Sequence, residues 1–393
     1  MKGRLALLPR TVWLLGLISL FNDTASDMIY PLVPLYLVSV LMAGPRALGL
    51  IEGIAEAVSS LVKLAAGVFA DRMHRMRGWV IGGYTLAGIA RPLIGITTSW
   101  VGVLACRFAD RVGKGLRSAP RDALISASVA PSERGLAFGL HRAMDNLGAV
   151  AGPLAAAALL AAGVGLRSIF LLAAVPAVIV FALVLTVPEP ARDPQLKPIP
   201  FRWSLAGLPP RYSRYLAVLA LFTLGNSSNM FLLLRARQLG LSELQVPLLW
   251  ALMSGFAALF STPLSGLSDR VGRTRLIVGG WVLYAVFYLI LGLLPPHPLL
   301  LWPMFAGYGV FLAATEGAEK ALVADLVPGE RAGTAFGWYN LVVGLMLLPA
   351  SALFGWLWQG TTPFAAFAFG AGCALTAALL LAVWVRPGSP APA

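Results

Sequence analysis

Long apolar segments separated by short polar gaps follow one another along almost the whole chain. A helix that crosses a membrane needs about 20 predominantly apolar residues, and most of these segments reach that length. Twelve spans are predicted, near residues 11–41, 46–70, 78–98, 100–125, 133–162, 166–187, 214–239, 244–268, 274–294, 299–327, 333–358 and 362–385. The pattern therefore predicts an all-α membrane protein with twelve transmembrane helices.

The widest polar gap divides these spans into two groups of six. It contains seven prolines, which favour a loop because proline cannot donate a backbone hydrogen bond. We predict an N-terminal six-helix half at 1–187, a cytoplasmic linker loop at 188–213 and a C-terminal six-helix half at 214–393.

Composition supports a membrane protein and excludes an ordinary soluble one. Hydrophobic residues make up 58% of the 393 residues and charged residues only 12%, whereas a soluble domain carries roughly 25% charged residues. So much apolar surface cannot be hidden in one core and must face lipid. The net charge of +13 does not indicate nucleic-acid binding, because Lys and Arg lie in the gaps between spans.

These gaps alternate in basic charge, which predicts the orientation of the chain. The basic gaps hold Lys2, Arg4 and Arg10; Arg72, Arg75 and Arg77; Arg192, Lys197, Arg202 and Arg211; and Arg270, Arg273 and Arg275. The gaps on the opposite side hold little beyond Arg46 and Arg167. Since cytoplasmic loops carry the excess of Lys and Arg, both termini and the central loop are predicted to be cytoplasmic.

An internal repeat relates the two halves. Asp71-Arg72 after the second span recurs as Asp269-Arg270 after the eighth, 198 residues later, and Ala137-Phe-Gly139 recurs at the same offset as Ala335-Phe-Gly337. Parallel repeats of six spans, with a substrate site near the membrane midplane between them, are a known plan for transporters.

Three motifs resemble those of the major facilitator superfamily, and the likeness covers nearly the whole chain. They are Gly67-Val-Phe-Ala-Asp71-Arg72 with its looser repeat ending in Asp269-Arg270, Arg111-Val-Gly-Lys-Gly-Leu-Arg-Ser-Ala119, and the fifth-span motif of Gly139, Gly148, Gly152 and Pro153. The resemblance implies two halves related by a pseudo-two-fold axis, with gating residues at the first motif. The fifth-span motif is typical of drug–proton antiporters, although Ala156-Ala157 replaces its final glycine pair.

Other segments resemble a narrower and largely uncharacterised bacterial branch of that superfamily. Asp23-Thr-Ala-Ser-Asp27-Met-Ile-Tyr-Pro31 and Gly113-Lys-Gly-Leu-Arg-Ser-Ala-Pro-Arg-Asp122-Ala-Leu carry this likeness. The branch includes nickel-resistance exporters, which usually carry a histidine-rich tail, whereas this chain has three histidines in all. The resemblance implies a multi-pass protein of the bacterial inner (plasma) membrane.

Ionisable residues inside the spans are the main candidates for function. Each costs at least about 2.5–3.5 kcal/mol at the centre of a bilayer, so such residues are rare without a role. The fourth span carries Arg107, Asp110, Arg111, Lys114, Arg117 and Arg121. At about 100° per residue they occupy an arc of roughly 120°, which must line a wet cavity or meet acids of other helices.

Acids at helical spacing occur in neighbouring spans. Asp23 and Asp27 lie one turn apart in the first span, Glu52 and Glu56 in the second, and His141 and Asp145 in the fifth. We predict that spans one, two, four and five of the N-terminal half build a charge network. The predicted contributors of the C-terminal half are Asn226, Asn229, Glu316, Glu319, Lys320 and Asn340.

The carboxylate pairs suggest a mechanism of proton coupling. A carboxyl group binds a proton more readily when buried or beside another carboxylate, and less readily when a cation approaches. Our hypothesis is that Asp23, Asp27, Glu52, Glu56 or Asp145 binds a proton from outside and releases it inside as Arg107 or Arg111 moves. A static ion-pair network is the alternative interpretation of the same residues.

Several candidates have a structural alternative. His141 is also typical of a hydrogen-bonded packing histidine, and Gly148, Gly152 and Pro153 of helix packing and bending. The structural alternative for Glu319 and Lys320 is that they form salt bridges between the halves on the cytoplasmic side. The tryptophans, Trp250 and Trp281 among them, are predicted to be interfacial or packing residues.

We expect a proton-coupled antiporter that exports a small organic compound by alternating access. The alternative is a proton-coupled exporter of a divalent metal ion such as nickel, with ligands from Asp23, Asp27, Glu56 and His141. An enzyme is not expected, because the chain has no Walker A lysine loop, HExxH or GxSxG motif. We expect no cofactor and no nucleic acid, with protons, membrane lipids and the substrate as partners of a monomer.

Overall fold

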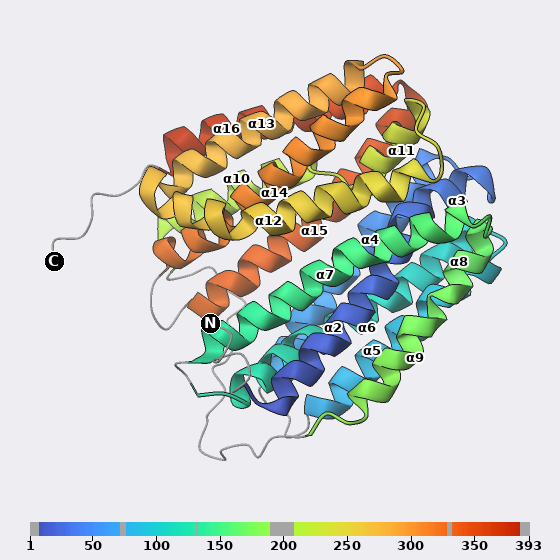
Figure 1. The fold of residues 1–393 in the computed structure, drawn as a ribbon. Helices are drawn as coiled ribbons and strands as arrows, with labels where there is room; N and C mark the ends of the chain where they lie inside the picture. Colours follow the sequence, from blue (N-terminus) through green and yellow to red (C-terminus); the bar gives the residue numbers. More distant parts are fainter. Residues whose placement is uncertain (1–7, 71–75, 131–132, 189–207, 328–331, 386–393) are drawn as a thin grey trace. The chain divides into compact units, whose positions relative to one another are not determined.

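The computed structural model describes residues 8–70, 76–130, 133–188, 208–327 and 332–385, and every regular element in these ranges is a helix (Figure 1). The helices of the first half are α2 (Arg10–Ile29), η1 (Tyr30–Leu32), α3 (Val33–Ser39), α4 (Pro45–Ala70), α5 (Met76–Leu93), η2 (Ile94–Ile96), α6 (Trp100–Ala127), α7 (Arg134–Ala161), α8 (Leu166–Leu172) and α9 (Ala174–Val184). Those of the second half are α10 (Pro210–Gly225), α11 (Met230–Gln238), α12 (Gln245–Val271), α13 (Arg273–Leu293), α14 (Pro298–Leu326), α15 (Ala332–Gly360) and α16 (Pro363–Trp384).

When consecutive short helices are joined, the described residues form twelve helical rods. Eight of them are long and apolar enough to cross a membrane by length and composition. The rods that begin at Arg10, Pro45 and Trp100 are not among the eight, and they carry the ionisable residues of the first, second and fourth spans. Charges that the protein keeps inside its spans therefore lower the hydropathy of the helices that carry them.

The contacts divide the chain into two compact units. Unit 1 comprises the described residues of Met1–Ala43, Ile54–Pro200 and Ser242–Ala251, and unit 2 those of Gly44–Gly53, Phe201–Leu241 and Leu252–Ala393. Two helices are thus shared: the start of α4 belongs to unit 2, and the start of α12 belongs to unit 1. The exchanged segments 44–53 and 242–251 are separated by 242 − 44 = 198 residues, the offset of the sequence repeat.

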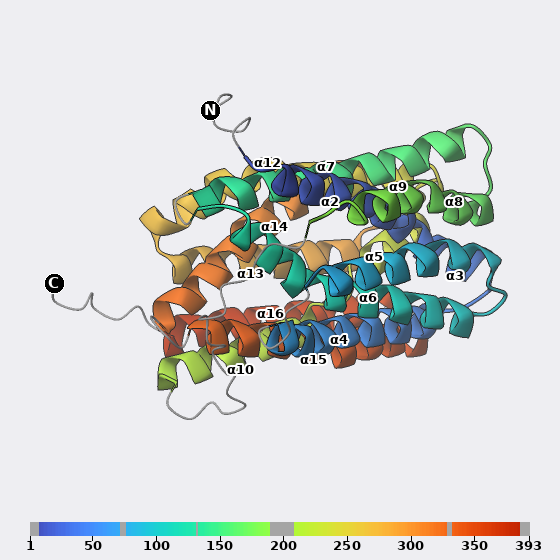
Figure 2. The same ribbon diagram turned by 90° about the horizontal axis from the view of Figure 1, so that it is seen from below.

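Helices in unit 1 approach one another closely through glycine. α2 and α7 lie side by side in Figure 1, and a Cβ added at Gly148 or Gly152 of α7 would lie 2.6 Å from Leu20 O or 2.5 Å from Thr24 O. α5 and α6 lie side by side in Figure 2, where Gly113 lies against the backbone of α5 in the same way. Small residues allow this backbone-to-backbone packing, which is a main source of helix association in membranes.

The seventh span, predicted near 214–239, is a candidate membrane span over Pro210–Gln238, and the structure shows an interruption within it. α10 ends at Gly225 and α11 begins at Met230, with four residues between them that do not continue the helix. Neighbouring side chains satisfy the released backbone groups: Tyr284 OH donates to Gly225 O at 3.0 Å, and Ser228 N donates to Ser351 Oγ at 3.2 Å. Irregular backbone at membrane depth is tolerated only where protein or water supplies such partners.

Candidate functional site

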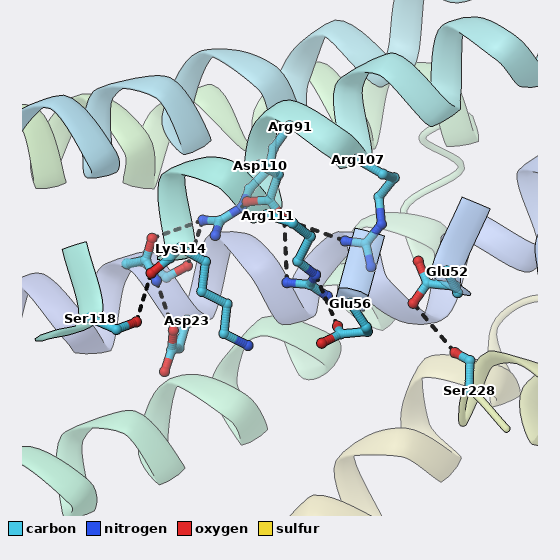
Figure 3. Close-up of polar contacts among 11 residues, drawn as sticks. Asp23, Glu52, Glu56, Arg91, Arg107, Asp110, Arg111, Lys114, Ser118 and Ser228 are labelled. Atoms are coloured by element: carbon cyan, nitrogen blue, oxygen red, sulfur yellow. Dashed lines mark hydrogen bonds and ion pairs between the residues drawn. The ribbon is translucent and has the colours of Figure 1, made fainter. Parts of the chain in front are cut away.

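Unit 1 contains a buried carboxylate with three arginine partners. Asp110 on α6 is fully buried, and its Oδ1 lies 2.8 Å from Arg91 Nε of α5 (Figure 3). Its Oδ2 lies 3.5 Å from Arg107 Nη1 and 3.4 Å from Arg111 Nη1, one turn or less away on the same helix. One negative charge is therefore shared by three buried cations, which we call the arginine cluster.

Arg91 connects this cluster to the first span, and our sequence analysis missed it. Its Nη1 donates to both the backbone O and the side-chain Oδ1 of Asn22 on α2, each at 3.0 Å. The Asn22 amide in turn donates to Asp23 Oδ1 at 2.8 Å. The missed signal was a single arginine near the end of an apolar span, and its cost in lipid would have marked it.

Glu56 lies at the accessible edge of the arginine cluster. Its Oε1 is 3.0 Å from Arg111 Nε, and 29% of its side chain is exposed, whereas the Arg111 side chain is 5% exposed. Lys114, one turn further along α6, is exposed, and Figure 3 shows its side chain extending between Asp23 and Glu56. The arginines of the cluster are therefore buried, whereas Glu56 and Lys114 beside them are accessible.

Asp27 is held by aromatic residues. The indole Nε1 of Trp250 donates to Asp27 Oδ1 at 3.1 Å, and the ring of Trp250 lies 4.7 Å from that of Tyr30. The guanidinium of Arg107 lies over the same Tyr30 ring, 5.8 Å from its centroid. Trp250 lies in segment 242–251 of α12, which belongs to unit 1. The sequence predicted a packing or interfacial role for this tryptophan, whereas in the structure it donates a hydrogen bond to Asp27.

His141 and Asp145 form a further pair on α7. His141 Nδ1 is 3.5 Å from Asp145 Oδ2, and the other carboxylate oxygen of Asp145 accepts a hydrogen bond from Ser19 of α2. His141 is buried, and its Nε2 has no hydrogen-bond partner among the described residues. The fifth span is therefore joined to the first at this pair, as well as through its glycines.

The predicted Glu52–Glu56 pair is divided between the two units. Glu52 is buried in unit 2, where its Oε2 accepts a hydrogen bond from Ser228 Oγ at 3.3 Å. Glu56 faces Arg111 in unit 1. One helical turn on α4 therefore separates two acids with different surroundings.

The other candidates of unit 2 have local partners. Tyr308 OH donates to Asn229 Oδ1 at 3.0 Å, and Asn340 Nδ2 donates to the carbonyl of its own helix at Phe336, at 2.7 Å. Lys320 pairs with Glu316 of its own helix at 2.8 Å. Asn226 lies where α10 ends, in the interrupted seventh span.

The described residues of the gating motif, its repeat and the fifth-span motif lie on different helices. Asp71 and Arg72 lie outside the described residues, whereas α4 includes Gly67 and the last turn of α12 includes Asp269 and Arg270. α12 ends just before Gly272, whose φ of +97° is one that glycine adopts without strain. Gly139 has no atom within 4 Å of an added Cβ, so only its fellow motif glycines Gly148 and Gly152 make close approaches.

The Major Facilitator Superfamily sequence model matches residues 15–234 and 215–393. The chain belongs to this superfamily. An uncharacterized MFS-type transporter of Methanocaldococcus jannaschii is 34% identical over 381 residues, which cover 95% of this chain and 94% of the relative. The multidrug resistance protein MdtH of Photorhabdus laumondii is 29% identical over 127 residues, about a third of each chain.

Solved structures give the same fold. A POT family transporter in complex with a thioalcohol-conjugated peptide matches with a TM-score of 0.80 at 12% identity, covering 95% of this chain and 96% of that one. The nucleoside transporter NupG matches with a TM-score of 0.79 at 14% identity, over 96% of this chain and all of that one. The prediction of an all-α membrane transporter with the major facilitator fold is confirmed.

Metal binding has little support from the geometry. Within the part of the chain that the structure describes, no group of three or more His, Cys, Asp or Glu side chains is placed to hold a metal ion. Of the four ligands considered for nickel, Glu56 faces Arg111, Asp27 accepts from Trp250 and His141 faces Asp145.

Proposed function

We propose that this transporter exports a small organic compound in exchange for protons. The observation that carries the proposal is a pair of partly exposed acids near the buried arginine cluster. Glu56 pairs with Arg111. Asp27 accepts from Trp250, whose ring contacts the same Tyr30 ring that Arg107 lies over. Burial beside cations makes the charge state of each acid depend on which partner is near it. The similarity to a multidrug resistance protein over a third of the chain supports an organic substrate.

The exchange proceeds through competition between the proton and the substrate for Glu56. While Glu56 is ionised, its accessible carboxylate binds the cationic group of a zwitterionic substrate from the cytoplasm, and the exposed Lys114 binds the anionic group of that substrate. A proton that binds Glu56 from outside neutralises the carboxylate and displaces the substrate to the outside, and release of the proton to the cytoplasm restores the substrate-binding state. The protein acts in the inner membrane with both termini cytoplasmic, as the distribution of Lys and Arg favours.

The substrate class is tested with purified protein before any mutation. A panel of anionic, zwitterionic and cationic organic compounds is screened by thermal shift, and each stabilising compound is followed in proteoliposomes with and without an imposed pH gradient. We expect gradient-driven flux of a zwitterionic compound and none of nickel salts. Nickel flux with no organic flux would reverse the assignment of the cargo.

Neutralising the coupling acids should separate proton coupling from substrate binding. Asp27→Asn and Glu56→Gln keep side-chain size but cannot lose a proton, so gradient-driven flux should fall to that of empty vesicles. Substrate counterflow without a gradient should persist at saturating substrate concentration, although Glu56→Gln binds the substrate more weakly, because counterflow requires no net proton movement. Asp122→Asn is the matched control, since this aspartate pairs with the adjacent Arg121; if all three variants keep gradient-driven flux, the acids do not carry the proton.

A further inference from the structure

Unit 2 contains another buried acid besides Glu52. Glu319 on α14 is 9% exposed, and its two carboxylate oxygens accept from two different helices. Trp281 Nε1 of α13 donates to Oε1 at 3.0 Å, and Tyr339 OH of α15 donates to Oε2 at 3.0 Å. Both donors are neutral, so these two hydrogen bonds bring no counter-charge to the acid.

The charged residues nearest in sequence have other partners. Glu316 and Lys320 pair with each other at 2.8 Å, and each is about half exposed (52% and 50%), so neither is buried with Glu319. Further along α14, Asp325 pairs with Arg273 of α13 at 2.7 Å. No ion pair to Glu319 occurs among the residues that the structure describes.

A further titratable group near Glu319 is Tyr215 of α10. Its side chain is fully buried, and its phenol oxygen has no hydrogen-bond partner among the residues that the structure describes. Tyr215 is neutral while its phenol is protonated, so it adds no counter-charge to the acid.

Both donors are packed inside unit 2. The indole of Trp281 is stacked on Phe222 of α10, with ring centroids 4.3 Å apart and planes 7° apart, and this packing orients its N–H toward Glu319. Tyr339 is 6% exposed within unit 2. Preformed donors of this kind stabilise the ionised form of a buried acid, while burial without a cation favours the neutral form. Both charge states thus have structural support at one position.

We propose that Glu319 is a second proton-binding site of this transporter, built by α10, α13, α14 and α15, which binds and releases a proton during the transport cycle. The inference rests on proton coupling as the mode of transport, but not on the acids of unit 1. Loss of the proton strengthens the hydrogen bonds from Trp281 and Tyr339, because bonds to a charged acceptor are stronger than bonds to a neutral one. The charge state of Glu319 therefore changes how firmly α13 and α15 are held to α14.

The test is a titration that needs no substrate. Purified protein in lipid vesicles is followed by infrared difference spectroscopy in the carbonyl-stretch region of protonated carboxyl groups as pH is raised. In Glu319→Gln we expect the loss of one titrating carboxyl band of the wild-type protein. Glu316→Gln is the matched control, one turn away on the same helix, and should keep that band. A wild-type spectrum retained in Glu319→Gln would overturn the proposal.

Two further variants keep the proposal testable should Glu319→Gln fail to fold. Trp281→Phe and Tyr339→Phe each remove one donor and retain an aromatic ring, so the protonated band should persist to higher pH than in the wild-type protein. An unshifted band in both would overturn the proposal. Because no substrate or gradient is involved, failure of this titration leaves the role of Asp27 and Glu56 intact, and failure of the exchange assay leaves this titration interpretable.

Discussion

Replacement of Asp110 by asparagine should destabilise the protein more than any other single neutralisation in unit 1. The aspartate is the shared counter-charge of Arg91, Arg107 and Arg111, all buried, and asparagine preserves its shape but not its charge. Removing one partner of a buried ion pair costs about 3–5 kcal/mol because the other charge is left uncompensated. We expect a marked fall in melting temperature, measured on purified protein in detergent, and low yield from membranes.

The control for this prediction is Asp122→Asn on the same helix. Its carboxylate pairs with Arg121 at 2.8 Å, but 47% of the side chain is exposed, so solvent screens the interaction. Exposed pairs contribute about 0–1 kcal/mol, and the melting temperature should hardly change. If Asp110→Asn melts like the control, the three arginines have another source of compensation and the arginine cluster is not the structural base of the site.

Replacement of Gly152 by alanine should separate α7 from α2 and displace Asp27. The added Cβ would lie 2.5 Å from Thr24 O and 2.6 Å from Met28 N, both backbone atoms that cannot rotate away. Overpacking of this kind costs about 1–3 kcal/mol, and the strain falls on the turn of α2 that carries Asp27. We expect a lower melting temperature together with loss of gradient-driven flux.

Gly139→Ala makes the same chemical change on the same helix, within the same sequence motif. No atom lies within 4 Å of its added Cβ, so neither stability nor flux should decrease. Alanine in place of glycine in a helix adds about 0.5–1 kcal/mol of stability where space permits. Equal losses in the two variants would mean that the motif acts through something other than close packing of α2 on α7.

The helical period of the sequence predicted much of the charge network in unit 1. The spacing of Arg107, Asp110 and Arg111 places them on one face of α6, and the structure brings them together. Their meeting with Glu56 and the first span agrees with the predicted combination of helices. These features depend on the geometry of single helices and on the cost of charge in lipid, both of which are local in sequence.

Contacts between side chains on different helices were harder to predict from the sequence. Arg91 completes the shell of Asp110 from the third span, and Trp250 and Trp281 donate to acids from helices that their spacing does not connect. Tryptophan in a membrane protein is common at interfaces and in packing, so composition alone gave no reason to choose these two. Only the side-chain directions in the folded chain distinguish a donor from a packing residue.

Hydropathy and residue spacing were enough to predict twelve membrane-crossing helices, a repeat at an offset of 198 residues and a concentration of intramembrane charge in the first half. Helix packing was needed to show that Glu52 and Glu56 belong to different units, that the seventh span is interrupted, and that Glu319 accepts from neutral donors. The physical reason is that hydropathy and helical period are properties of one segment, whereas a side chain's partner depends on which helices pack together and at what register.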